Sequence, residues 1–140
     1  MKKKVRLTLI GRQRDEAGQE NVTELSADAE YYERNGSQYI LYEENGTDTG
    51  RIQSIIKLKD GLLELTRKGS VNTRMIFEEG REHVADYITP PGTLQLGIAT
   101  SAVCSKRSGD CLEIHADYDL TNRGHILSHC HIFIKIQDLV

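Results

Sequence analysis

The residues of this sequence that are most suited to chemistry are histidines and an acid near its C-terminal end. His115 and Asp117 alternate in one segment, and His129 and His131 alternate in the next. In extended strands such residues share a face, and directly opposed residues have Cβ atoms about 4.5–5.5 Å apart. A turn centred on Arg123 would place Asp117 opposite His129 and His115 opposite His131. Imidazole binds zinc, nickel and copper, so the pattern predicts a metal-binding patch; the alternative is a solvated outer face.

A second candidate is an arginine within an apolar segment. Leu63, Leu65 and Arg67 alternate, so they share a face if the segment is a strand. If the leucines point into a core, the guanidinium does too, and it then needs a carboxylate, carbonyls or an anionic ligand as its partner. We expect Arg67, with Tyr39 and Tyr42 nearby, to bind the carboxylate or phosphate group of a ligand. The alternative is a structural arginine that closes one end of the fold beside a strand-end acid or a tyrosine.

The motifs of common enzyme classes are absent from the sequence. There is no G-x-S-x-G, no P-loop, no dinucleotide-binding glycine pattern and no H-E-x-x-H. Acids and histidines can be paired on paper, but no feature of the sequence places them in a cleft. We therefore expect a protein that is not an enzyme and needs no cofactor.

Length and charge narrow the class of protein further. The chain has 140 residues, which fits a single domain over 1–140, and 18 basic against 21 acidic residues give a net charge of −3. Proteins that bind nucleic acid usually carry a basic excess, so nucleic acid is not expected as a partner. The apolar stretch after Lys4 is short and is interrupted by Arg6 and Thr8, which fits neither a signal peptide nor a membrane helix. These features predict a cytoplasmic protein without a membrane partner.

The three cysteines also fit a reducing compartment. Their odd number predicts free thiols rather than a disulfide framework. Cys104 follows the alternation of Leu96 and Ile98 and is expected on a core face, whereas Cys111 precedes Leu112 and is expected to face outward. Side chains on opposite faces cannot meet disulfide geometry.

Short alternating runs separated by glycine turns indicate that these residues are carried by β-strands. Asn35-Gly36 is the strongest hairpin signal, because both residues tolerate the positive φ of a type I′ turn. Segment 26–34 has some features of a capped helix, but its tyrosines directly before the hairpin favour a strand. The expected strands include 5–9, 37–44, 51–59, 62–67, 70–78, 83–88, 93–106, 111–120 and 125–137. Eight to ten such strands in a meander must curl or close to protect their edges, so an all-β antiparallel barrel is predicted.

Several pieces of this pattern are together similar to a known family. Segments 65–69 and 75–77, with 39–43 before them and 116–120 after them, resemble the YwiB-like family of small bacterial proteins of unknown function. The resemblance covers almost the whole chain. It implies a calycin-like β-barrel, similar in shape to lipocalins, and no established activity.

Three functions are compatible with these observations. The first is a binding module for a small, partly apolar ligand inside the barrel or at its mouth, and the second is a structural or interaction protein with a packed barrel, acting through its surface or as a homodimer. The metal-binding patch is the third. A binding module needs a connected cavity of about 300 Å³ or more, so the interior separates the first two.

Overall fold

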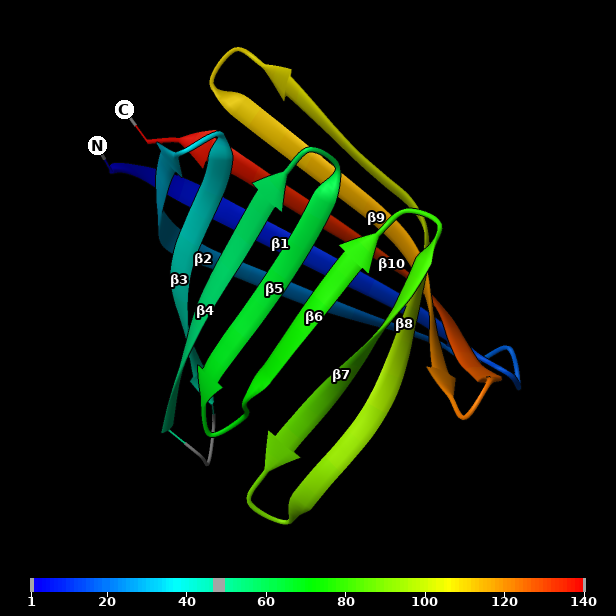
Figure 1. The fold of residues 1–140 in the computed structure, drawn as a ribbon. Coiled ribbons are helices and arrows are strands. Elements are labelled where there is room, and N and C mark those ends of the chain that lie inside the picture. The colour runs from blue at the N-terminus through cyan, green and yellow to red at the C-terminus, as the bar shows by residue number, and fades with distance from the viewer. Residues whose placement is uncertain (1, 47–49, 140) are drawn as a thin grey trace.

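Ten antiparallel strands form the whole of the computed structural model, which describes residues 2–46 and 50–139 (Figure 1). The strands are β1 (Lys3–Asp15), β2 (Glu20–Arg34), β3 (Ser37–Gly46), β4 (Gly50–Lys59), β5 (Leu62–Gly69), β6 (Thr73–Glu78), β7 (Arg81–Thr89), β8 (Gly92–Ser108), β9 (Cys111–Asn122) and β10 (His125–Asp138). The prediction of an all-β protein with eight to ten strands is confirmed. Segment 26–34 is a strand, and the turn after Asn45-Gly46 lies outside the described residues.

The strands form one sheet that curls into a nearly closed barrel. Each strand pairs with its neighbour in sequence, and β1 also pairs with β10, so the sheet order is β6-β5-β4-β3-β2-β1-β10-β9-β8-β7. The two edge strands, β6 and β7, are bridged by a pair of backbone hydrogen bonds of 2.9 Å between Asn72 and Ile88. Gly80 N also donates to Thr100 O at 2.9 Å. The expected meander therefore closes, except along the seam between β6 and β7 and at a second opening between β2 and β3.

Tight turns set the register of several hairpins. Asn35, Asp60 and Arg123 have positive φ, and a glycine with positive φ follows each of them. Two residues in this conformation make a two-residue hairpin turn whose twist matches that of the flanking strands. Asn35-Gly36 behaves as the sequence predicts.

The interior of the barrel is filled by apolar side chains. Alternate residues of each strand point inward, and Phe77, which is fully buried, packs edge-on against Tyr118 with ring centroids 4.8 Å apart. The buried apolar residues that form this cluster are Val5, Leu7, Ala29, Tyr31, Ile40, Tyr42, Ile56, Leu58, Leu63, Leu65, Met75, Phe77, Ala85, Ile98, Leu112, Ile114, Ala116, Ile132, Ile134 and Ile136. Burial of this set is the main source of stability.

Two bulges change which residues face inward. The β8–β9 register shifts between Thr100 and Ala102, so Val103 rather than Cys104 packs on the core, and Cys104 is exposed. The expectation that Cys104 lies on the core face is therefore wrong, because an extra residue at Ser101 reverses the alternation. All three cysteines are free thiols, as predicted.

The second bulge lies at the start of β10. Its register against β9 shifts between Ile126 and Ser128, and Ile126, which alternation placed in the core, is exposed. The turn is centred between Arg123 and Gly124, and the bulge adds one further residue. Together they move the partners of the β10 histidines by two positions from the predicted register.

The sheet also forks between β2 and β3. β2 pairs with β1 from Glu20 to Tyr31, but it pairs with β3 only from Glu30 to Arg34. Beyond Leu41, β3 pairs with β4 alone. The barrel wall therefore opens between residues 20–29 of β2 and residues 42–46 of β3.

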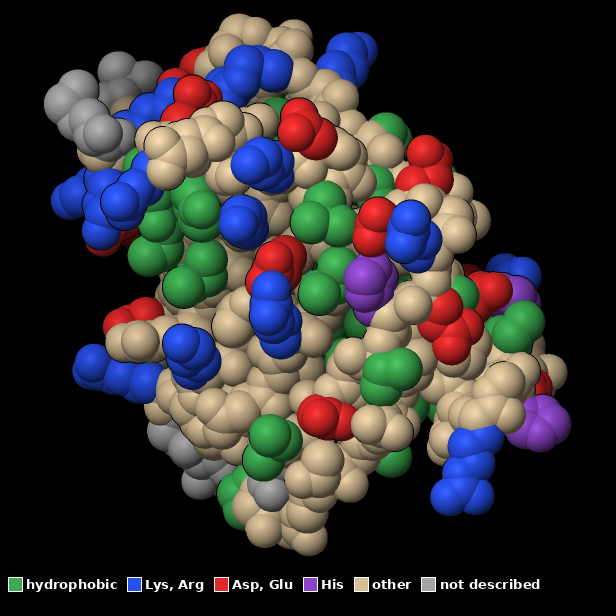
Figure 2. Space-filling view, viewed as in Figure 1, with side chains coloured by type: hydrophobic (Ala, Val, Ile, Leu, Met, Phe, Trp, Pro, Cys, Tyr) green, Lys and Arg blue, Asp and Glu red, His purple; other side chains and the backbone are tan. Residues whose placement is uncertain are grey.

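The visible surface carries charges of both signs. On the face shown in Figure 2, basic and acidic side chains are interspersed among hydrophobic ones. Among the described residues, no helix is long and apolar enough to cross a membrane.

Candidate functional site

Four inward-facing side chains lie directly opposite one another across four neighbouring strands. Tyr42 of β3 pairs with Ser54 of β4, Ser54 pairs with Arg67 of β5, and Arg67 pairs with Thr73 of β6. We call these four residues the Arg67 row. Arg67 shares its face with the buried Leu65, as the alternation of β5 requires. The row lies where β5 ends and β6 begins, and we refer to this as the Arg67 end of the barrel (Figure 1).

Arg67 has one carboxylate partner within the protein. Its Nη2 donates to Glu44 Oε2 at 2.7 Å, and the two side chains are only 26% and 20% exposed. This is the strand-end acid that the structural alternative for Arg67 requires. Glu44 offsets the charge of the guanidinium but uses only one of its donor nitrogens.

The remaining polar atoms of the row are short of partners. Arg67 Nε, Ser54 Oγ and Thr73 Oγ1 are buried and make no hydrogen bond of ordinary geometry. Buried polar atoms without partners are uncommon in proteins, and each one costs about 1–3 kcal/mol. Three such atoms in adjacent positions therefore mark this end of the barrel as a place where an additional hydrogen-bonding group would be stabilising.

Two tyrosines border Arg67. Burial, followed by the charge of Glu44, raises the pKa of Tyr42 to about 12, while the nearby Ser54 hydroxyl and Arg67 oppose the shift. Burial also raises the pKa of Tyr87, again opposed by Arg67, and Tyr87 Oη donates to Met75 Sδ at 3.0 Å. Both phenols are therefore neutral donors near the guanidinium over the physiological pH range.

Tyr39, which the sequence grouped with Arg67, lies elsewhere. It is three residues from Tyr42 along β3, so it points to the opposite, outer face. Its ring stacks on Tyr32 with centroids 4.8 Å apart, and Lys57 Nζ lies 5.7 Å from its centroid. The expected grouping of Tyr39 with Arg67 and Tyr42 is therefore wrong.

A polar cluster occupies the opposite end of the barrel. Arg107 Nη2 donates to Tyr31 Oη at 2.9 Å, and this hydroxyl donates to Glu33 Oε1 at 2.7 Å. The guanidinium carbon of Arg107 also lies 5.5 Å from the centroid of the Tyr31 ring. Every one of these groups has a partner, unlike those of the Arg67 row.

The histidine patch lies on the outer face of β9 and β10. His129 is opposite Asp119, with Nδ1 2.5 Å from Oδ1, and His131 is opposite Asp117, with Nδ1 2.6 Å from Oδ1. His115 is opposite Phe133 rather than His131. The predicted pairs are therefore wrong by two positions, because the turn is centred half a residue later than predicted and the bulge adds one residue to β10.

Despite this shift, three of the predicted metal ligands, His115, His131 and Asp117, still lie in contact as a chain. His115 Nδ1 lies 3.2 Å from His131 Nε2, so both nitrogens of His131 have partners. In the described part of the chain, no three His, Cys, Asp or Glu side chains converge as metal ligands would. A metal ion would have to replace the contact between the two imidazoles. Metal binding by His115, Asp117, His129 and His131 stays a prediction, which a zinc titration followed by histidine NMR signals would test.

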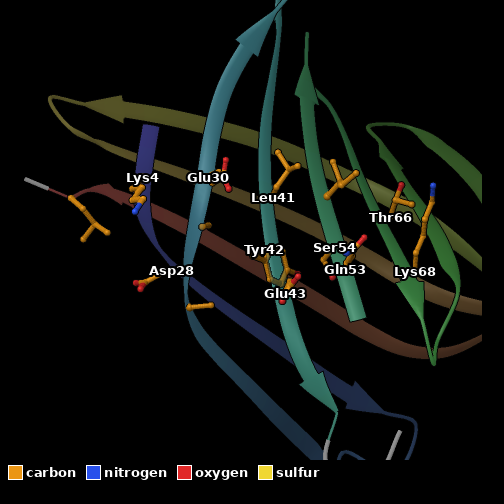
Figure 3. Close-up of a pocket in the computed structure, with 14 residues that line it drawn as sticks. Lys4, Asp28, Glu30, Leu41, Tyr42, Glu43, Gln53, Ser54, Thr66 and Lys68 are labelled. Atoms are coloured by element: carbon orange, nitrogen blue, oxygen red, sulfur yellow. The ribbon is translucent and has the colours of Figure 1, made fainter. Parts of the chain in front are cut away.

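A groove of about 730 Å³ lies at the fork between β2 and β3. Figure 3 shows Asp28 and Glu30 on one side of it, Thr66 and Lys68 on the other, and Leu41 between them. These side chains point to the outside of the barrel, because they alternate with the inward-facing residues of their strands. The buried Tyr42 and Ser54 of the Arg67 row also line this groove, so it reaches that row through the fork.

Sequence reasoning found Arg67 and Tyr42 but missed the other residues around them. Ser54 and Thr73 are small polar residues at inward positions, and only the register between strands shows that they lie beside Arg67. Glu44 and Tyr87 are also far from Arg67 in sequence. The sequence contains one indication that Ser54 points inward, which is its alternation with Ile52 and Ile56 on the same face of the strand.

The fold and this site define a small antiparallel β-barrel with a partly unsatisfied polar end. The chain belongs to the family described as a domain of unknown function (DUF1934), whose model matches residues 7–134. It is 26% identical over 117 residues to the uncharacterized β-barrel protein YwiB of Bacillus subtilis (strain 168), covering 84% of this chain and 81% of the relative. The crystal structure of the ywiB protein from Bacillus subtilis has the same fold, with a TM-score of 0.88 at 23% identity, covering 99% of this chain and 94% of that one. The resemblance found in the sequence is confirmed.

Proposed function

We propose that this chain is a non-enzymatic binding module that holds a small, partly apolar molecule at the Arg67 end of its barrel. The observation that carries this proposal is the Arg67 row, in which Arg67 Nε and Thr73 Oγ1 are buried without a partner. Ser54 Oγ is buried beside the Tyr42 hydroxyl and makes no hydrogen bond of ordinary geometry. The hydrogen-bonding capacity at this end exceeds what the protein itself uses. A ligand that accepts these hydrogen bonds would remove the free-energy cost of leaving buried donors without an acceptor.

The charge at the site limits the chemistry of the ligand. Glu44 already offsets the positive charge of Arg67 at 2.7 Å. A phosphate dianion would add excess negative charge to a largely buried site, which is unfavourable. A carbonyl or a single carboxylate oxygen fits better, because it can accept from Arg67 Nε and the two hydroxyls without that excess.

The surroundings of the row favour a partly apolar ligand. Leu65 and Met75 are opposite each other, one position further into the barrel on the same face, and Tyr87 contacts Met75. The apolar part of the ligand would lie against these side chains, with its polar oxygen at the row. The three free cysteines support a cytoplasmic location, and the Bacillus relative, itself described as a β-barrel protein, supports a bacterial origin.

The proposal is tested by NMR titration of the ¹⁵N-labelled protein with hexanoate and hexanamide, with hexyl phosphate as the doubly charged comparison. We expect saturable shifts of the Arg67 Nε–H signal with the first two probes and weaker binding of the phosphate. Arg67→Met should abolish these shifts. Arg74→Met is the matched control, because Arg74 pairs with Glu64 on the outer face.

Two results would contradict the proposal. Equal loss of binding in both variants would mean that positive charge in general, rather than the Arg67 row, attracts the probes. Absence of any shift in a folded wild-type protein would favour the packed interaction protein, with Arg67 as a structural residue paired with Glu44.

A further inference from the structure

The edge of β2 along the fork is a long strand edge without a partner strand. Residues 20–29 pair with β1 on one side, and β3 pairs with β2 only from Glu30 onward. The segment contains no proline and no lysine, and its charged residues are the acids Glu20, Glu24 and Asp28. Its last three residues, 27–29, border the groove of about 730 Å³ between the two strands (Figure 3).

The backbone groups that face the fork can be assigned from the hydrogen-bond pattern. Asp15 N donates to Gln19 O at 3.0 Å, so odd-numbered residues of β2 bond to β1 in this antiparallel ladder. Even-numbered residues therefore direct their N–H and C=O groups away from β1. β3 takes those of residues 30, 32 and 34, while those of Val22, Glu24, Ser26 and Asp28 face the fork.

The side chains beside this edge have a distinct pattern on each face. On the outer face, Glu24 and Asp28 are exposed on β2, and Glu43 is exposed across the groove. Asp28 pairs with Arg6 at 2.8 Å, whereas Glu24 and Glu43 have no ion pair among the described residues. Lys4 and Lys68 also line the groove, so its charge is mixed, and Glu24 and Glu43 are the carboxylates at the fork that a basic side chain could still pair with.

The inner face at the same edge is apolar and incompletely covered. Leu25 is opposite Leu9, and both are only partly buried against the core. The next two inward residues of β2 are the small Ala27 and Ala29. An apolar side chain placed beside them would cover Leu25 and extend the core.

We propose that this fork is a docking site for an extended polypeptide segment with alternating basic and apolar residues, which adds as a strand to the edge of β2. Its backbone would bond to Val22, Glu24, Ser26 and Asp28, as in other cases of strand addition. Its basic side chains would lie beside Glu24 and Asp28, and its apolar side chains would lie beside Leu25. The proposal does not rest on small-molecule binding at the Arg67 row, although Tyr42 and Ser54 of that row also line the groove at the fork.

Charge distinguishes this partner from a second copy of the chain. Antiparallel pairing of two β2 edges about Ser26 would place Glu24 of each copy opposite Asp28 of the other, and directly opposed like charges are destabilising. A basic strand would instead place positive charges opposite Glu24 and Asp28, so the electrostatic energy of pairing would be favourable.

The test uses a Lys-Val-Lys-Val-Lys-Val-Lys peptide, whose length matches the span from Val22 to Asp28, and ¹⁵N-labelled protein. We expect saturable amide shifts along this span and hydrogen exchange at the fork-facing amides that slows about tenfold. Ser26→Pro should abolish binding, because it removes a backbone N–H that faces the fork and takes no part in the β1 ladder. Ser26→Ala keeps this N–H and should bind the peptide as the wild type does. Glu24→Lys should weaken binding about fivefold.

A second measurement does not depend on the folding of any variant. The same peptide with N-methyl groups on alternate residues loses donors on one edge while keeping its charge, and it should not bind. Equal binding of the N-methylated peptide or of a Glu-Val alternating peptide would overturn the proposal. So would the absence of shifts in residues 20–29, or self-association of the protein that Ser26→Pro removes.

Discussion

Replacing Arg67 with methionine tests the inward position of its guanidinium through stability. The substitution removes the partner of Glu44, whose carboxylate is 20% exposed and lies beside the buried Tyr42. The outer face supplies a comparison on the adjacent strand, since Arg74 is 64% exposed and pairs with Glu64, which is 15% exposed. Both changes break one Arg–Glu pair and leave a largely covered carboxylate, and they differ mainly in the exposure of the arginine.

The expected costs follow from that difference. Breaking a fully buried pair costs about 3–5 kcal/mol, and an exposed pair contributes about 0–1 kcal/mol. Because Arg67 and Glu44 are partly exposed, we expect Arg67→Met to lower the free energy of unfolding by about 2 kcal/mol. For Arg74→Met we expect about 1 kcal/mol, because Arg74 is exposed while Glu64 is largely covered.

Urea unfolding followed by circular dichroism measures both values. With a slope of about 1.5 kcal/mol per molar urea, the midpoint should fall by about 1.3 M for Arg67→Met and by about 0.7 M for Arg74→Met. Adding Glu44→Gln to Arg67→Met should restore about half of the loss, since it removes the unpaired charge. Equal costs for the two arginines, or no recovery in the double variant, would refute this account of Arg67.

Three further predictions concern other parts of the fold. Because the pKa of Tyr42 is raised from 10.0 to about 12, its contribution to stability is complete below pH 10 and is lost as pH rises toward 12; Tyr42→Phe should reduce that loss in alkaline urea titrations. Cys104 should react with a thiol reagent in the folded protein, whereas buried Cys130 should react only on unfolding; equal rates would contradict the bulge at Ser101. Gly69→Ala should cost about 2 kcal/mol in thermal unfolding, because a Cβ would collide with the Arg51 carbonyl at a φ of 144°, and a neutral result would contradict that backbone.

The fold was predictable because the alternation and the turn residues of this chain agree with one another. Asn35-Gly36 and Asp60-Gly61 fix two hairpins, and the inward residues of most strands follow from a period of two. The predictions failed where one extra residue enters a strand. Bulges at Ser101 and Leu127 reverse or shift the alternation, and no residue type in these segments marks them in advance.

The candidate site was only partly predictable for a related reason. Arg67 stands out because a charged residue continues the pattern of Leu63 and Leu65. Its neighbours Ser54 and Thr73 are set by the register between strands, which a single sequence does not specify. The fork between β2 and β3 was likewise invisible, since both segments read as ordinary strands.

Native mass spectrometry of the protein purified from its own host tests small-molecule binding at the Arg67 row most directly. We expect the wild-type chain to carry one additional small mass per protein and the folded Arg67→Met variant to carry none, with Arg74→Met unchanged. A clean unliganded mass for the wild type, or the same additional mass on the Arg67→Met variant, would contradict binding at this end of the barrel.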